Sequence, residues 1–156
     1  MKNTQINRLA TVKVAKALGS LCPEVVFVGW APGNQWFQKG FDKAISTILD
    51  GQEIKLLPLP YFLATKFEAF FSRGSSDPYA SKDLEDLVYL FNHTSNIVVQ
   101  ILEAPEDVRS FLLNAIQQLL NDAAAMRAIP GHLFYENAEE QYREIKQKLK
   151  MLVSSS

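Results

Sequence analysis

Five charged side chains lie close together in one stretch of the sequence, YFLATKFEAFFSRGSSDPYASKDLEDLVYL, which runs from residue 61 to residue 90. The five are Lys66, Arg73, Asp77, Asp83 and Asp86. A basic group that grips a phosphate, together with carboxylates that position it or contact a metal ion, is what phosphoryl-transfer chemistry requires. This stretch is therefore the first candidate for a functional site.

The elements expected around these charges are two helices joined by a glycine-containing loop. Lys66 lies one turn from Phe62 and from Phe70, beside the apolar stripe of the first helix, so its ammonium group must be paired or reach solvent. Asp83 and Asp86 are three residues apart on the second helix and project from one face. If the two helices pack antiparallel, the lysine and the two aspartates can meet across the hairpin.

The same pattern also has a purely structural interpretation. Asp83 and Asp86 stand in the first two turns of a helix, where the helix dipole favours carboxylates. Lys66 then only neutralises them. The spacing of the charges is compatible with both interpretations.

Outside this stretch, the pattern predicts an N-terminal helix, a small sheet and further helices. Apolar spacing predicts a helix over 4–18, and the β-branched run EVVFVGW predicts a buried strand over 24–30. A short helix is expected around Trp36 and Phe37, and the runs AISTIL and EIKLLPLP, joined by Asp-Gly, predict a β-hairpin. Helices are expected over 59–71, 81–92, 95–104, 105–129 and 136–153.

The bulk composition indicates one globular domain, 1–156, with the N-terminal helix and small sheet in 1–60 and the helical region in 61–153. The chain is 47% hydrophobic and 21% charged, and its formal net charge of -1 excludes a general electrostatic attraction to nucleic acid or anionic lipid. A single cysteine, Cys22, and apolar runs well short of the ~18 residues of a membrane span favour a cytoplasmic protein without a membrane partner.

The run LPYFLATKFEAFFSRGSSDPYASKDLEDLVYLF resembles the C-terminal signature of bacterial nucleotidyltransferase-like proteins related to the AbiEii abortive-infection toxins, which are type IV toxins. The likeness extends upstream to NQWFQKGFDKAISTILDGQEIKLLPLP and downstream to AIPGHL, and so covers roughly 34–133. The resemblance implies an α/β (α+β) fold, in which a small mixed sheet of nucleotidyltransferase type is followed by a helical C-terminal half.

The resemblance also implies roles for the charged residues. Lys66 would meet the nucleoside triphosphate, and Asp83 and Asp86 would form the supporting acidic pair, which makes these three the catalytic candidates. Arg73 and Asp77 match the loop positions and join Lys66 as nucleotide-binding candidates. The implied activity is Mg²⁺-dependent transfer of a nucleoside monophosphate from the triphosphate to RNA or protein, beside an antitoxin-like partner protein.

The sequence departs from the family pattern in its first part. Family members carry a small residue after the glycine that ends the first strand, and an Asp-x-Asp strand that supplies the metal ligands. Here Gly29 is followed by Trp30, and no Asp-x-Asp occurs, so the metal ligands stay unassigned. We therefore expect an internally shortened member whose transfer activity is impaired, or alternatively a non-catalytic module that binds a nucleotide or a partner of a toxin–antitoxin type system.

The sequence is compatible with two further interactions. The flank of a sheet that lacks its neighbouring strands would favour a homo-oligomer. The C-terminal helix carries Arg143, Lys146, Lys148 and Lys150, which could contact an RNA backbone. It also carries Glu139, Glu140 and Glu144, and alternating charge of this kind is typical of a solvated face.

Overall fold

A computed structural model of the protein describes residues 34–154. The chain divides into two compact units, 1–58 and 59–156. The helix expected over 4–18, the strand expected over 24–30, Cys22 and Trp30 lie outside the described residues.

The described part of the first unit begins with a short helix, α3 (Gln35–Phe41). The side chain of Asn34 caps it by accepting hydrogen bonds from the backbone N–H groups of Trp36, at 3.1 Å, and Phe37, at 3.2 Å. These bonds satisfy two of the donors that a helix leaves unpaired at its N-terminus. The short helix expected around Trp36 and Phe37 is confirmed.

A β-hairpin follows, made of β1 (Ile45–Leu49) and β2 (Gln52–Leu56). The strands pair antiparallel, with Ile45 opposite Leu56 and Thr47 opposite Ile54. The two turn residues, Asp50 and Gly51, both have positive φ, 51° and 79°, as a two-residue type I′ turn requires. The hairpin predicted from Asp-Gly is confirmed, and the sheet within residues 34–154 is this antiparallel pair. The expected mixed sheet depends on the strand predicted over 24–30, which lies outside the described residues.

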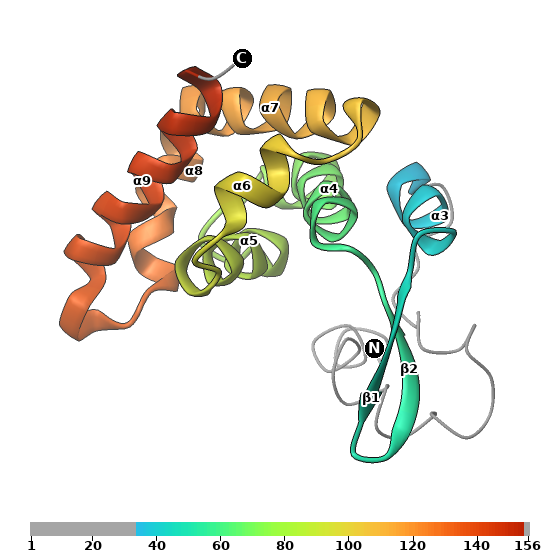
Figure 1. Cartoon of the computed structure of the whole chain (residues 1–156). Helices are drawn as coiled ribbons and strands as arrows, with labels where there is room; N and C mark the ends of the chain where they lie inside the picture. The colour runs from blue at the N-terminus through green and yellow to red at the C-terminus, as the bar shows by residue number, and fades with distance from the viewer. Residues whose placement is uncertain (1–33, 155–156) are drawn as a thin grey trace. The chain divides into compact units, whose positions relative to one another are not determined.

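The second unit is helical, as the sequence predicts for the C-terminal half (Figure 1). Its elements are α4 (Leu59–Ala69), the π-helical turn η3 (Phe70–Gly74), α5 (Lys82–His93), α6 (Ile97–Leu102), α7 (Glu106–Asn121), α8 (Ala123–Ala128), the 3₁₀ turns η4 (Ile129–His132) and η5 (Tyr135–Asn137), and α9 (Ala138–Ser154).

The single helix predicted over 105–129 is wrong, because the chain breaks at Asp122. This residue is extended, with φ -84° and ψ 98°, and its side chain accepts hydrogen bonds from the backbone N–H groups of Ala124 and Ala125. Asp122 therefore ends α7 and starts α8 as an N-cap, a position that aspartate prefers over a helix interior.

Apolar side chains from these helices form the core of the second unit. Helix α4 packs against α5 and α7, and α9 packs against α5, α6 and α7. The largest fully buried side chains are Tyr61, Phe67, Phe70, Phe91, Leu63, Leu84, Leu87, Ile97, Ile101, Leu112, Ile116 and Ile129. Each buried Leu, Ile or Phe stabilises the fold by about 1.5–3 kcal/mol relative to an exposed one. This core fixes the α4–α5 pair that carries the candidate site.

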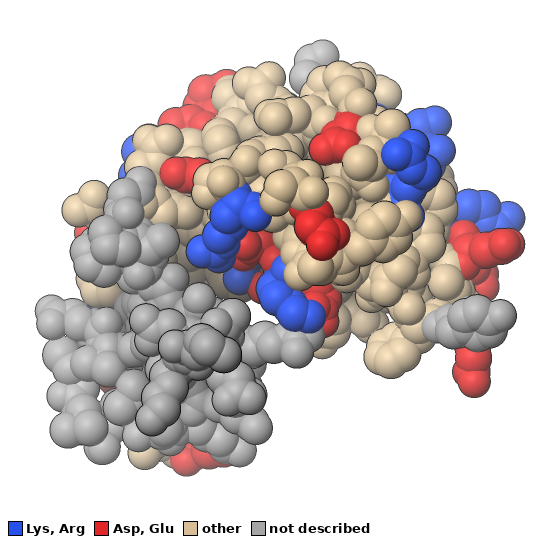
Figure 2. Space-filling model, turned by 180° about the vertical axis from the view of Figure 1, so that it is seen from behind, with Lys and Arg blue, Asp and Glu red and all other residues tan. Residues whose placement is uncertain are grey.

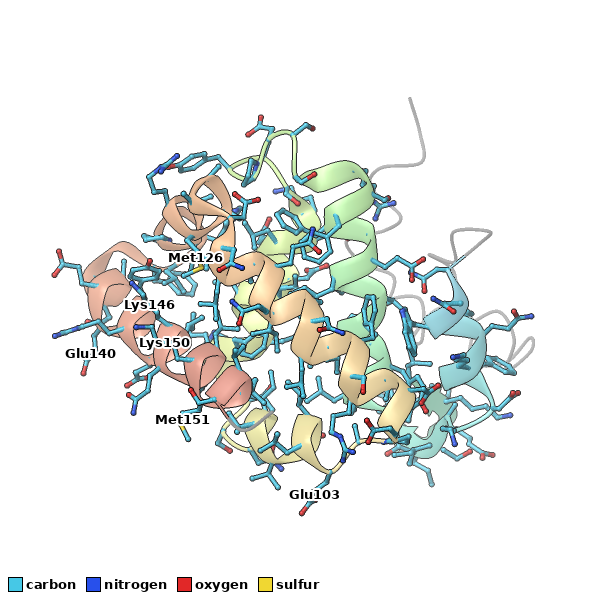
Figure 3. The ribbon with its side chains drawn as sticks, turned by 90° about the horizontal axis from the view of Figure 1, so that it is seen from above. Glu103, Met126, Glu140, Lys146, Lys150 and Met151 are labelled. Carbon is cyan, nitrogen blue, oxygen red and sulfur yellow. The ribbon has the colours of Figure 1, made fainter. Side chains whose placement is uncertain are left out.

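Helix α9 also makes one polar contact to the end of α5. The Nζ atom of Lys148 donates a hydrogen bond to the carbonyl of Phe91, at 2.6 Å, and so satisfies a carbonyl in the last turn of α5. The outer side of α9 carries Glu140 and Lys150, which project outward (Figure 3). This alternation of signs continues elsewhere on the surface, where basic and acidic side chains lie beside each other (Figure 2).

None of the helices in residues 34–154 combines the length and the apolar character needed to cross a membrane.

Candidate functional site

Arg73 and Asp83 form the best-aligned ion pair of the α4–α5 hairpin. The Nε atom of Arg73 donates to Oδ2 of Asp83 at 2.8 Å, and Nη2 donates to Oδ1 at 3.1 Å. Two parallel N–H···O bonds of this kind fix the guanidinium plane against the carboxylate. The pair ties the end of the η3 turn to the first turn of α5.

Lys66 lies between the two aspartates of α5. Its Nζ atom is 2.6 Å from Oδ2 of Asp86 and 3.7 Å from Oδ1 of Asp83. Asp83 is therefore shared by two cations, and we call these four residues, Lys66, Arg73, Asp83 and Asp86, the seam network. Lys66, in α4, pairs with Asp86, and Arg73, in the η3 turn that follows α4, pairs with Asp83 one turn earlier in α5. The two helices therefore run antiparallel, and the expected meeting of Lys66 with Asp83 and Asp86 across the hairpin is confirmed.

The chain reaches this arrangement through the η3 turn. Helix α4 does not stop at Ala69 but widens into a π-helical turn that ends at Gly74. A Cβ atom built on Gly74 would collide with Oγ of Ser81 and would press on the ring of Phe70. Ser81 is also the N-cap of α5, accepting a hydrogen bond from the backbone N–H of Leu84 at 3.2 Å. Gly74 thus lets the loop return close enough to start α5 beside Arg73.

The members of the seam network differ in exposure. The side chain of Asp83 is only 8% exposed and that of Lys66 is 18% exposed, whereas Asp86 is 46% and Arg73 55% exposed. The pKa of Arg73 is raised, first by the hydrogen bond that it donates to Asp83, with the charge of Asp83 adding to the rise and partial burial opposing it. The network is a buried carboxylate covered by one shielded and one half-exposed cation.

Asp77 is placed apart from these four residues. It lies in the loop between η3 and α5, where its Oδ1 accepts a hydrogen bond from the backbone N–H of Ala80 at 3.3 Å. Among the ion pairs of the described residues, none involves Asp77. The structure therefore joins four of the five predicted site residues and gives the fifth a turn-forming contact.

Two contacts from residues 127–132 hold the same loop, and the sequence pattern did not reveal them; of the two, only the contact from His132 lies in the AIPGHL segment. The hydroxyl of Tyr79 donates to the carbonyl of Arg127 at 3.2 Å, and Nε2 of His132 donates to the carbonyl of Pro78 at 2.9 Å. The partners are 48 and 54 residues apart. The resemblance to known proteins extends to AIPGHL but assigns no role to this segment. In the structure, His132 of this segment anchors the loop that precedes α5.

Helix α4 also carries two buried polar atoms without a hydrogen-bond partner. They are the hydroxyl of Tyr61, in a residue that is 2% exposed, and Oε2 of Glu68. Burial raises the pKa of Glu68, and it raises the pKa of Tyr61 together with the charge of Asp107. Neither residue stood out in the sequence, because an aromatic residue and a glutamate are ordinary in a helix.

The buried carboxylate of the seam network is not available to a magnesium ion. Mg²⁺ binds oxygen ligands, and every carboxylate oxygen that Asp83 presents is taken by Arg73 or Lys66. Within residues 34–154, no group of three or more His, Cys, Asp or Glu side chains is placed to hold a metal ion. The carboxylates of this site serve the two cations.

The seam network can present cationic hydrogen-bond donors to a ligand. Arg73 has five N–H donors, of which two point at Asp83, and Lys66 has three, of which one points at Asp86. The remaining donors sit on two adjacent cations whose positions are fixed by carboxylates. Such a pair is suited to bind an anion with several oxygens.

No protein-family model, no curated protein and no solved structure matches the chain. The resemblance to nucleotidyltransferase-like proteins therefore stays a prediction.

Proposed function

We propose that the α4–α5 hairpin binds the phosphate groups of a nucleoside triphosphate through Lys66 and Arg73. In this proposal the protein is an AbiEii-related, nucleotidyltransferase-like protein that holds a nucleotide but is impaired in transfer. The resemblance over 34–133 supports the choice of a nucleotide, and the seam network supports the choice of the two cations.

The observation that carries the proposal is the shared carboxylate. Asp83 contacts both Lys66 and Arg73, so the two cations are held side by side although they come from separate turns of α4 and η3. A ligand that binds there does not have to order two long side chains, which would otherwise cost about 0.5–1.5 kcal/mol each. Triphosphates present closely spaced oxygens that match such a pair of donors.

The network is electrically neutral, since two cations face two carboxylates. A triphosphate must therefore compete with the aspartates, and the exposed Asp86 is the partner that can yield, because its side chain is 46% exposed. Asp83 is buried and stays with Arg73. We therefore expect modest affinity, with Lys66 turning from Asp86 toward the ligand.

Transfer of the nucleotidyl group is not assigned to these residues. The family reaction depends on Mg²⁺, and among the described residues no group of three or more His, Cys, Asp or Glu side chains is placed to hold a metal ion. Asp83 and Asp86 act in this proposal as positioning residues for Lys66 and Arg73, and the catalytic role that the resemblance implies for them stays a prediction.

Calorimetric titration with each of the four nucleoside triphosphates, with and without Mg²⁺, tests the proposal. Lys66→Ala and Arg73→Ala should each weaken binding by about tenfold or more, because one charge-assisted hydrogen bond contributes about 1.5–3 kcal/mol. Lys82→Ala is the matched control, since Lys82 pairs with Glu85 on the exposed side of α5 at 2.8 Å. Wild-type protein that binds no triphosphate would overturn the proposal.

A radiolabel-transfer assay on bulk RNA, run on the same variants, separates holding from transfer. We expect no labelled RNA from the wild-type protein. Label transfer that disappears in Lys66→Ala and in Asp86→Ala would show that the chain is an active enzyme and that its metal ligands lie elsewhere.

A further inference from the structure

Two exposed rings lie against each other, tilted, on the outer face of α5. The ring of Tyr89 lies 4.4 Å from the ring of His93, centroid to centroid, with an angle of 45° between their planes. Tyr89 is 62% exposed, and both residues lie on the solvent side of the helix. Pairs four residues apart stabilise a helix by only about 0.2–0.5 kcal/mol, so helix stability alone is a weak reason for an exposed tyrosine here.

Tyr89 lies further along α5 than the two aspartates of the seam network. Asp83 holds Arg73, Asp86 holds Lys66, and Tyr89 follows three residues later. Each three-residue step turns by about 60° around the helix, from the buried Asp83 through the half-exposed Asp86 to the exposed Tyr89. The distance along the helix from Asp83 to Tyr89 is about 9 Å at 1.5 Å per residue. Two cations and then an aromatic surface follow each other along one helix.

Helix α4 also carries an aromatic ring beside its cation. Phe62 lies one turn before Lys66, its ring centre is 5.4 Å from Nζ of Lys66, and its side chain is partly exposed.

We propose that the Tyr89 ring is the stacking surface for the base of the bound nucleotide. This inference rests on the proposed function, because the phosphates must lie on Arg73 and Lys66 for the base to reach Tyr89. A nucleoside triphosphate carries its charge at one end and a flat ring at the other, in the same order as the side chains along α5. Every base has a π face, so such a site accepts all four bases with similar affinity.

The test compares ATP with inorganic tripolyphosphate, which has the charge but no base. Calorimetric titration of the full chain should give tighter binding of ATP than of tripolyphosphate by about tenfold, the order expected from stacking one base on an aromatic ring. Tyr89→Ala should reduce the affinity for ATP to that for tripolyphosphate and leave the tripolyphosphate affinity unchanged. Tyr89→Phe should keep the difference.

Phe134→Ala is the matched control, because Phe134 is an exposed aromatic residue (77%) outside the α4–α5 hairpin and should change neither affinity. Equal wild-type affinities for the two ligands, or a Tyr89→Ala variant that keeps the full ATP affinity or weakens both ligands alike, would overturn the stacking proposal and leave the phosphate site standing. Failure of both ligands to bind the wild-type protein would overturn the phosphate site and the stacking proposal together.

Discussion

Two kinds of ion pair occur in the second unit, and they differ in surroundings more than in chemistry. Lys82 and Glu85 are 2.8 Å apart within one turn of α5, with side chains that are 54% and 38% exposed. The seam network has similar distances, but it joins two helices around Asp83, whose side chain is 8% exposed. Exposed pairs contribute about 0–1 kcal/mol, whereas a buried charge that loses its partner costs far more. The burial of the carboxylate therefore determines how much free energy of unfolding is lost when an ion pair is broken.

Arg73→Met should give the largest effect. It leaves the buried carboxylate of Asp83 with only Lys66, at 3.7 Å, so we expect the free energy of unfolding to fall by about 3 kcal/mol, the lower end of the range for breaking a buried pair, because Arg73 itself is half exposed. Urea denaturation followed by far-UV circular dichroism measures the loss. Lys82→Met, the control, should change stability by less than about 0.5 kcal/mol; equal losses in the two variants would contradict the comparison.

Gly74→Ala should come next. The new methyl group collides with Oγ of Ser81 and presses on Phe70, so the loop must shift and the pairing of Arg73 with Asp83 must loosen. Overpacking of this kind costs about 1–3 kcal/mol. The double variant with Ser81→Gly should recover part of the loss, because glycine is a tolerable N-cap and removes the colliding atom. An equal loss of stability in the single and the double variant would mean that the strain does not arise at the contact between the new methyl group and Ser81.

The local features of the fold were predictable because their signals lie within a few residues of one another. Asp-Gly between two strand-like runs predicted the hairpin. The place of Lys66 beside the apolar stripe and the three-residue spacing of Asp83 and Asp86 predicted that these residues would meet if the two helices packed antiparallel. The break at Asp122 also has a local sequence signal, an aspartate followed by three alanines. The prediction missed it because the helical apolar spacing continues across 105–129.

The rest depends on contacts between distant parts of the chain. The hydrogen bonds from Lys148 to Phe91 and from His132 to Pro78 join residues 57 and 54 positions apart. Helical periodicity shows which face of each helix is buried but not which partner covers it. The Arg73–Asp83 pair was missed for a related reason, since the π-helical turn at Phe70–Gly74 rotates Arg73 away from the position that a regular α-helix would give it.

Asp86→Asn should change binding more than stability. The side chain is 46% exposed, so its loss should cost less than about 1 kcal/mol of stability. The network then carries one net positive charge, and tripolyphosphate should bind about fivefold more tightly, since an exposed unit charge near the ligand is worth about 1 kcal/mol. Calorimetry at low salt measures the gain.

Glu85→Gln is the matched control for Asp86→Asn, because it removes one negative charge from the adjacent position on α5, where the partner is Lys82. We expect a smaller gain in that variant. A gain of the same size would mean that tripolyphosphate responds to the net charge of α5 and not to the release of Lys66.

Glu68→Gln should give the smallest effect, and it should raise the free energy of unfolding, whereas Arg73→Met and Gly74→Ala should lower it. Burial raises the pKa of Glu68, so its contribution to stability is fully present below its ordinary pKa and is lost as the pH rises through the raised folded value. At pH 7 the buried charge, whose Oε2 has no partner, is a cost that glutamine removes, and stability should rise by less than about 1 kcal/mol. Below about pH 4 the glutamate is protonated and the two proteins should unfold alike. Glu140→Gln, at an exposed position of α9, is the control and should leave the free energy of unfolding nearly unchanged at both pH values. A fall in the free energy of unfolding of Glu68→Gln at pH 7 would contradict the prediction. It would mean that a cation holds the carboxylate of Glu68, as cations hold that of Asp83.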